Sequence, residues 1–152
     1  MKHCVPYTLM LLFILLSASV KSQNTNGVKP KIFNNFPEKI NCSQAELDKA
    51  FLATANQNIR LSFSDNFLFE GIVTSNVVKY SNLQTVVIQS LVYDNAIFVI
   101  SKITNTDNTL EYVGRIINQK YFDGYQLKKD AAGNYQFIKI ETSRVIQDCA
   151  HN

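Results

Sequence analysis

The chain has 152 residues, of which 46% are hydrophobic, and it carries 15 lysines and arginines against 12 aspartates and glutamates. This length suits one packed domain of about 100–150 residues. Ten phenylalanines and seven tyrosines exclude the composition of a disordered chain. A formal net charge of +3 is too small to indicate nucleic-acid binding by itself.

Residues 1–22 have the pattern of a secretory signal peptide. Lys2 supplies a positive charge, residues 8–16 form an apolar run, and small or polar residues lead up to Ser22. Cleavage is therefore expected before Gln23. An uncleaved anchor needs about 20 apolar residues, and this run is shorter. We therefore expect a secreted or periplasmic protein with no membrane association after cleavage.

Cleavage changes the charge of the chain. It removes Lys2 and Lys21 but no acidic residue, which leaves 13 basic against 12 acidic residues and a net charge of +1. This near-neutral balance and the exported location predict that nucleic acid is not a partner.

Cleavage also removes Cys4 and leaves Cys42 and Cys149. An even pair of cysteines in an exported chain predicts a disulfide. A Cys42–Cys149 bridge would close a loop of about 108 residues and would stabilise the fold by about 4–5 kcal/mol.

The mature chain begins with a polar, flexible leader at residues 23–31, and residues 32–152 are expected to form a single domain. Phe33 and Phe36 are apolar anchors that are expected to pack on the core, with an exposed patch as the alternative. Ser43 and Glu46 fit a capping box, in which each side chain accepts a hydrogen bond from the other residue's backbone N–H. Apolar residues then recur at helical spacing, which predicts a helix over residues 44–55.

The rest of the domain has the pattern of β-structure. Short runs of alternating or β-branched residues are separated by polar turns, which favours antiparallel pairing of successive strands. Asp123-Gly124 is a two-residue hairpin signal. The predicted strands cover residues 59–64, 67–73, 83–93, 96–104, 110–118, 125–128 and 135–142, with a further strand at 144–147. The predicted fold class is α+β, mainly β: one N-terminal helix packed on an antiparallel meander of six to eight strands, with curling toward a barrel or sandwich left open.

Two of the central strands are apolar on both faces. Val86-Val87-Ile88 and Ile97-Phe98-Val99-Ile100 do not alternate as a strand in a one-sided sheet would. We therefore expect cover on both sides of these strands. The helix would provide one cover, and the curled sheet, the Phe33/Phe36 segment or a second subunit would provide the other.

The mature chain lacks the residues of several catalytic designs. His151 is its one histidine, which argues against an oriented Ser–His or Cys–His pair and against a histidine zinc site. The glycines are scattered singly, so no phosphate-binding loop is expected. We predict no cofactor and no metal. Carboxylate chemistry is the remaining enzymatic route, and its candidates are Glu70, Glu111, Asp123 and Glu141.

The densest cluster of aromatic and polar residues is the candidate binding surface. A glycine beside aromatic residues on a sheet can leave room for a ligand or for another backbone, and Tyr and Arg are favoured at binding hot spots. The alternative is that Gly114 relieves packing beneath a large cross-strand ring and that Arg115 pairs with Glu70 or Glu111. The surface comprises Tyr112, Gly114, Arg115, Tyr121 and Tyr125.

These features predict an exported, non-enzymatic binding or interaction domain. Its partner would be a protein or a small apolar ligand, and a homodimer is compatible with the two-sided strands. One alternative is a β-barrel-like carrier of a small apolar ligand, which requires an open interior. The other is a carboxylate-based hydrolase, which requires two carboxyl groups about 5–10 Å apart in one cleft.

Overall fold

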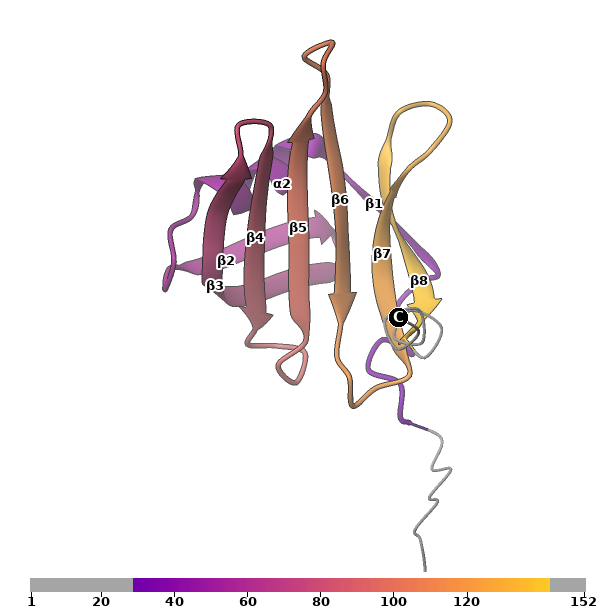
Figure 1. Ribbon diagram of the computed structural model, residues 1–152. Coiled ribbons are helices and arrows are strands. Elements are labelled where there is room, and N and C mark those ends of the chain that lie inside the picture. Colours follow the sequence, from indigo (N-terminus) through magenta and orange to yellow (C-terminus); the bar gives the residue numbers. More distant parts are fainter. Residues whose placement is uncertain (1–28, 143–152) are drawn as a thin grey trace, which may run out of the picture.

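The computed structural model describes residues 29–142, and within that range it contains one helix and an eight-stranded antiparallel sheet (Figure 1). The strands follow the order β1-β8-β7-β6-β5-β4-β3-β2. The mainly β fold with one helix and an antiparallel meander is therefore confirmed. The elements are β1 (Lys39–Cys42), α2 (Gln44–Leu52), β2 (Asn58–Ser64), β3 (Phe67–Tyr80), β4 (Leu83–Ser90), β5 (Ile97–Thr104), β6 (Leu110–Ile117), β7 (Asp123–Lys129) and β8 (Tyr135–Glu141).

The sheet curls into a nearly closed barrel. β3 is 14 residues long and bends, so that its first half pairs with β2 behind and its second half runs beside β4 in front (Figure 1). Shifts in register between Val73 and Ser75 and between Val78 and Tyr80 mark β-bulges, which bend a strand and increase its twist. The first strand, β1, pairs with the last one, β8, and lies near β2, so the two ends of the sheet approach each other.

Aromatic side chains fill the inside of the barrel. Inward positions alternate along each strand, as the two-residue period of a β-strand requires. Phe63 and Phe137 have ring centroids 4.7 Å apart, and Phe67 stacks on Tyr93 at 5.5 Å. The rings that are less than 2% exposed are those of Phe33, Phe67, Phe69, Phe98, Tyr112, Tyr125 and Phe137.

The segment before β1 closes one end of the barrel. Phe33 is fully buried, with its ring 5.2 Å from that of Tyr125 and 5.3 Å from that of Tyr93. The carboxylate of Asp123 accepts hydrogen bonds from the backbone N–H groups of Ile32 (2.7 Å) and Phe33 (3.0 Å). The expectation that Phe33 and Phe36 anchor this segment on the core is confirmed, because Phe36 also packs against the buried cluster.

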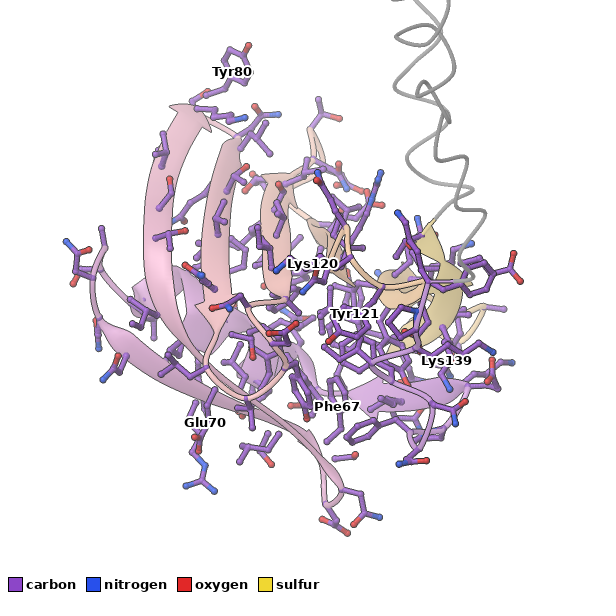
Figure 2. The ribbon with its side chains drawn as sticks, turned by 90° about the horizontal axis from the view of Figure 1, so that it is seen from below. Phe67, Glu70, Tyr80, Lys120, Tyr121 and Lys139 are labelled. Carbon is purple, nitrogen blue, oxygen red and sulfur yellow. The ribbon has the colours of Figure 1, made fainter. Side chains whose placement is uncertain are left out.

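Further bonds fix the same segment to β7 and β8. The Tyr125 hydroxyl donates to the carbonyl of Pro37 (2.6 Å), and Lys139 Nζ donates to the carbonyl of Phe36 (2.7 Å). Figure 2 views this end of the barrel from below, with Lys139 on the opposite side of the molecule from Glu70. Residues 30–38 are thereby held to strands that lie between 88 and 103 residues away in sequence.

Helix α2 begins as the sequence predicts and ends earlier. Ser43 is the N-cap, and its Oγ accepts a hydrogen bond from the N–H of Glu46 (3.2 Å). The Glu46 half of the predicted capping box is wrong, because its carboxylate instead accepts from the N–H of Ser62 in β2 (2.6 Å) and pairs with Lys49. The helix ends at Leu52 rather than at residue 55, and the extended Ala53 follows.

Three predictions about the strands are corrected. Asp123-Gly124 is not a hairpin turn: both residues lie in β7 and pair with Glu141 and Ile140, because the Asp123 carboxylate is occupied by the N-terminal segment. The short edge strand β1 was not predicted from the sequence, and β3 ends at residue 80 rather than at the predicted residue 73. The predicted signal peptide, most of the leader, the strand at 144–147, Cys149 and His151 lie outside the described residues.

We expect Asp123→Asn to destabilise the protein by about 1.5–3 kcal/mol, because the amide replaces a charged acceptor of one buried and one partly buried backbone N–H group. Urea unfolding measures the change. Asp65→Asn is the matched control, since Asp65 is exposed in the turn between β2 and β3, and it should change stability by less than about 0.5 kcal/mol. Equal stability of the two variants would contradict the clamping role of Asp123.

Candidate functional site

The outer face of the central strands is apolar. Val77 of β3, Ile97 of β5 and Val113 of β6 are 47%, 43% and 42% exposed, and outward-facing Val87, Val99 and Ile117 are half-buried. The strand pairing places them together, because Val87 lies opposite Val99 and Ile97 lies opposite Ile117. Helix α2 and the N-terminal segment both pack on the inner side. The central strands were expected to be covered on both faces. Among the described residues, packed elements cover only their inner face.

A groove of about 380 Å³ crosses this face where β6 and β7 separate. The two strands share only three register pairs, from Gly114 opposite Leu127 to Ile116 opposite Tyr125, and they diverge toward the upper end in Figure 1. Beyond that point the N–H of Tyr112 donates to the hydroxyl of Tyr135 (3.1 Å). The groove is lined by Val99, Ser101, Val113, Gly114, Arg115, Ile117, Gln126 and Leu127.

Gly114 allows β5 and β6 to approach closely at the groove. A Cβ added there would lie 2.8 Å from the carbonyl oxygen of Val99 and 3.2 Å from Cε2 of Phe98. The first distance is too short for any side chain. The packing alternative from the sequence analysis therefore holds for Gly114, since the neighbouring ring is the buried Phe98.

Arg115 is the charged group of the groove. It is exposed, and its strand position faces outward beside Gln126 of β7. Within residues 29–142 it forms no ion pair: of the two partners considered for it, Glu70 is 3.1 Å from Arg60 Nε, and Glu111 has no ion pair with it. A guanidinium on an apolar wall offers a forked set of donors for a carboxylate or another planar anion.

The three tyrosines of the predicted surface lie elsewhere. Tyr112 and Tyr125 point into the barrel, where their hydroxyls donate to Asp48 Oδ1 (2.6 Å) and to the Pro37 carbonyl (2.6 Å). Tyr121 lies in the loop at the lower end, and its hydroxyl donates to Asp94 (2.9 Å) (Figure 2). Of the five predicted residues, the structure thus brings only Gly114 and Arg115 to the groove.

The remaining groove residues were not among those predicted from the sequence for the binding surface. Their signal was present in the sequence, because Val99, Val113 and Ile117 are apolar residues at outward positions of strands whose inner positions are also apolar. What the sequence lacked was the separation of β6 from β7, which turns these positions into a groove that also reaches Leu127.

The four candidate carboxylates are only partly brought together. Glu70 is paired with Arg60, and Glu111 is exposed on β6. Asp123 and Glu141 lie opposite each other on β7 and β8 and line a second groove of about 410 Å³ with Lys31, Glu38, Phe122, Lys139 and Ile140. Both oxygens of Asp123 accept backbone hydrogen bonds, which assigns that carboxylate a structural role.

Among residues 29–142, no three His, Cys, Asp or Glu side chains are grouped so that they could hold a metal ion. In the same range, no helix has the length and apolar character needed to cross a membrane.

Comparisons with protein-family models, curated proteins and solved structures find no match to this chain.

The buried tyrosines predict loss of stability at high pH. Burial raises the pKa of Tyr112 and of Tyr125 above the ordinary value of 10, so the folded state holds these protons more tightly than the unfolded chain. Their contribution is complete below about pH 10 and is lost as the pH rises further, by about 1.4 kcal/mol per pH unit for each group. Urea unfolding between pH 8 and 11 should show this decline.

Tyr125→Phe should make the decline shallower, whereas Tyr80→Phe, at a position 69% exposed, should leave it unchanged. An identical slope for the wild type and Tyr125→Phe would show that Tyr125 ionises as freely as in an unfolded chain.

Proposed function

We propose that this chain is an exported, non-enzymatic interaction domain that binds a partner protein on the outer face of β5 to β7. The observation that carries the proposal is the groove between β6 and β7, where apolar side chains surround Arg115. Exposed apolar surface with a polar rim is typical of interaction sites in water-soluble proteins. The residues that build the groove belong to adjacent strands of a rigid sheet, so the site is preformed.

The groove favours an extended peptide segment as the bound group. Its apolar wall runs along Val113 and Ile117 of one strand, so a segment lying parallel to β6 would place every second side chain against it. Arg115 lies between these two positions and offers its donors to an acidic residue of the segment. The partner chemistry is therefore an extended stretch with apolar residues and a carboxylate.

The carrier alternative receives less support from the packing. An apolar ligand inside the barrel would have to occupy the space of Phe63, Phe98 and Phe137, whose ring centroids lie 4.7–5.9 Å apart. The hydrolase alternative rests on Asp123 and Glu141, and both oxygens of Asp123 already accept hydrogen bonds from the backbone of the N-terminal segment. A second copy of the chain is a further candidate for the cover of the outer face.

Export is part of the proposal, and it rests on the signal-peptide pattern of residues 1–22. Export would place the chain in an oxidising environment, which the predicted Cys42–Cys149 bridge requires. Cys42 is 8% exposed at the end of β1, and burial raises the pKa of its thiol to about 12. Such a thiol stays protonated and unreactive at neutral pH.

Peptide mapping without reductant tests the bridge in protein secreted by an expression host. We expect a linked pair of peptides containing Cys42 and Cys149. In the Cys149→Ser control, Cys42 should resist iodoacetamide at pH 8 in the folded state and react with it in urea. Two free thiols in the secreted wild-type protein would contradict the bridge.

Selection of peptides from a displayed library of random linear sequences tests the interaction site. Selected peptides should carry an acidic residue flanked by apolar ones, and Val113→Asp or Arg115→Glu should weaken their binding at least tenfold in calorimetric titrations. The wild type and both variants should unfold at similar temperatures, because both side chains are exposed.

Val78→Asp is the matched control, since Val78 is 66% exposed on β3 away from the groove. It should leave peptide affinity unchanged. Peptides that bind Val113→Asp as tightly as the wild type, or that respond to Val78→Asp, would place the binding site elsewhere and refute the proposal.

A further inference from the structure

The outer face of β3 to β6 carries its side chains in rows that run across the sheet. Figure 1 shows these strands side by side, with α2 and β2 behind them. In the middle row, Val113 of β6 lies opposite Ser101 of β5, Ser101 opposite Thr85 of β4, and Thr85 opposite Val77 of β3. The hydroxyl groups of Thr85 and Ser101 are 2.9 Å apart and bond to each other. Only small or β-branched side chains stand along this row.

The rows on either side of the middle row are mostly apolar, and each carries one charge, on β6. One row holds Glu111, Ile103, Leu83 and Tyr80, and the other holds Arg115, Val99, Val87 and Ser75. An acidic and a basic side chain therefore lie two positions before and two positions after Val113 on the same face. Both are exposed, and the ion pairs within residues 29–142 include neither of them.

We propose that a second copy of this chain covers the outer face, packed sheet against sheet about a two-fold axis. The axis lies between the two sheets and follows the middle row, perpendicular to the strands. Each strand then lies over its own copy in the antiparallel direction, and each outer row lies over the opposite outer row. Glu111 of either copy thereby faces Arg115 of the other, on both sides of Val113.

The apolar positions match under the same rotation. Ile103 faces Val99 of the other copy, and Leu83 faces Val87. Sheets that pack face to face lie about 10 Å apart, and their strands are inclined by about 30°. Glu111 and Arg115 are each about 7 Å from the axis, so this inclination moves them sideways by only about 3–4 Å. Their long side chains can span that offset.

The charge pattern selects this rotation over the other one available to two facing sheets. A two-fold axis that ran along β6 would place each row over itself. Glu111 would then face Glu111 of the other copy, and Arg115 would face Arg115. Like charges held opposite each other at an interface are destabilising, so the antiparallel arrangement is favoured.

The size of the face indicates a weak and reversible dimer. Four strands about 4.8 Å apart and seven residues of strand length give it about 19 by 23 Å. This is less than the roughly 800 Å² per partner of a standard stable interface, so we expect a dissociation constant on the order of micromolar. The dimer covers Val113 and Arg115 and therefore competes with the partner segment proposed above, although it does not depend on that segment.

Sedimentation equilibrium of the secreted protein, with charge reversals, tests the dimer. Glu111→Arg and Arg115→Glu should each raise the dissociation constant about tenfold or more, because each makes both facing pairs alike in charge. The double variant Glu111→Arg/Arg115→Glu should restore the affinity to within about threefold of the wild type. An equimolar mixture of the two single variants should also associate, since every facing pair between them is opposite in charge.

Lys39→Glu is the matched control. It changes the net charge by the same amount as Arg115→Glu, at an exposed position of β1, which lies three strands from β6. It should leave the dissociation constant unchanged. A short bismaleimide tests the register of the two copies. It should link Val113→Cys to its copy on the axis but not Ile117→Cys, whose two copies lie about 26 Å apart along the strands.

A protein that stays monomeric throughout the micromolar range would overturn the proposal. A dimer that the single charge reversals leave unchanged, or one in which Ile117→Cys is linked in preference to Val113→Cys, would also overturn it. Peptides selected for the groove should dissociate the dimer. Peptide binding by a permanently monomeric protein would reject the dimer and keep the proposed function, whereas a confirmed dimer with no selected peptide would do the reverse.

Discussion

The buried carboxylate of Asp123 holds together the parts of the barrel that meet at its lower end. Burial of a charge is costly unless the charge is compensated, and here two backbone N–H groups of the N-terminal segment provide the compensation. The same contact places Phe33 among the rings of Tyr93 and Tyr125. Because Asp123 begins β7 and lies opposite Glu141, the N-terminal segment is coupled directly to the last two strands.

Filling the interior with aromatic rings has a consequence for the outside of the barrel. Helix α2, β2 and the N-terminal segment all pack on the inner side of the central strands. Their β-branched outer residues, among them Val99 and Val113, therefore remain in contact with water in the described structure. The groove arises where β6 and β7 part and the hydroxyl of Tyr135 takes the place of a strand neighbour for Tyr112. The groove therefore results from the way in which the barrel closes.

Close approach at two glycines determines how the groove is bounded. Gly114 brings β5 against β6 beside Phe98, and Gly124 brings β7 against β6, because a Cβ added there would lie 2.6 Å from the carbonyl oxygen of Ile116. Neither glycine has a positive φ, so their role is steric and not conformational. A site built in this way depends on backbone proximity between segments, which a linear pattern of residue types does not record.

The sequence alone determined the helix start at Ser43, the antiparallel succession of strands and the anchoring of Phe33, because these follow from local periodicity, capping and hydrophobicity. It also identified strands that are apolar on both faces, and it included Gly114 and Arg115 among the candidate residues. Only the tertiary structure decided that Tyr112 and Tyr125 face the interior, that Asp123 is a clamp and not a turn residue, and that a groove opens beside Arg115. Those outcomes depend on which side of a strand meets the closing segments, and that choice is made by contacts between residues as far as 103 positions apart.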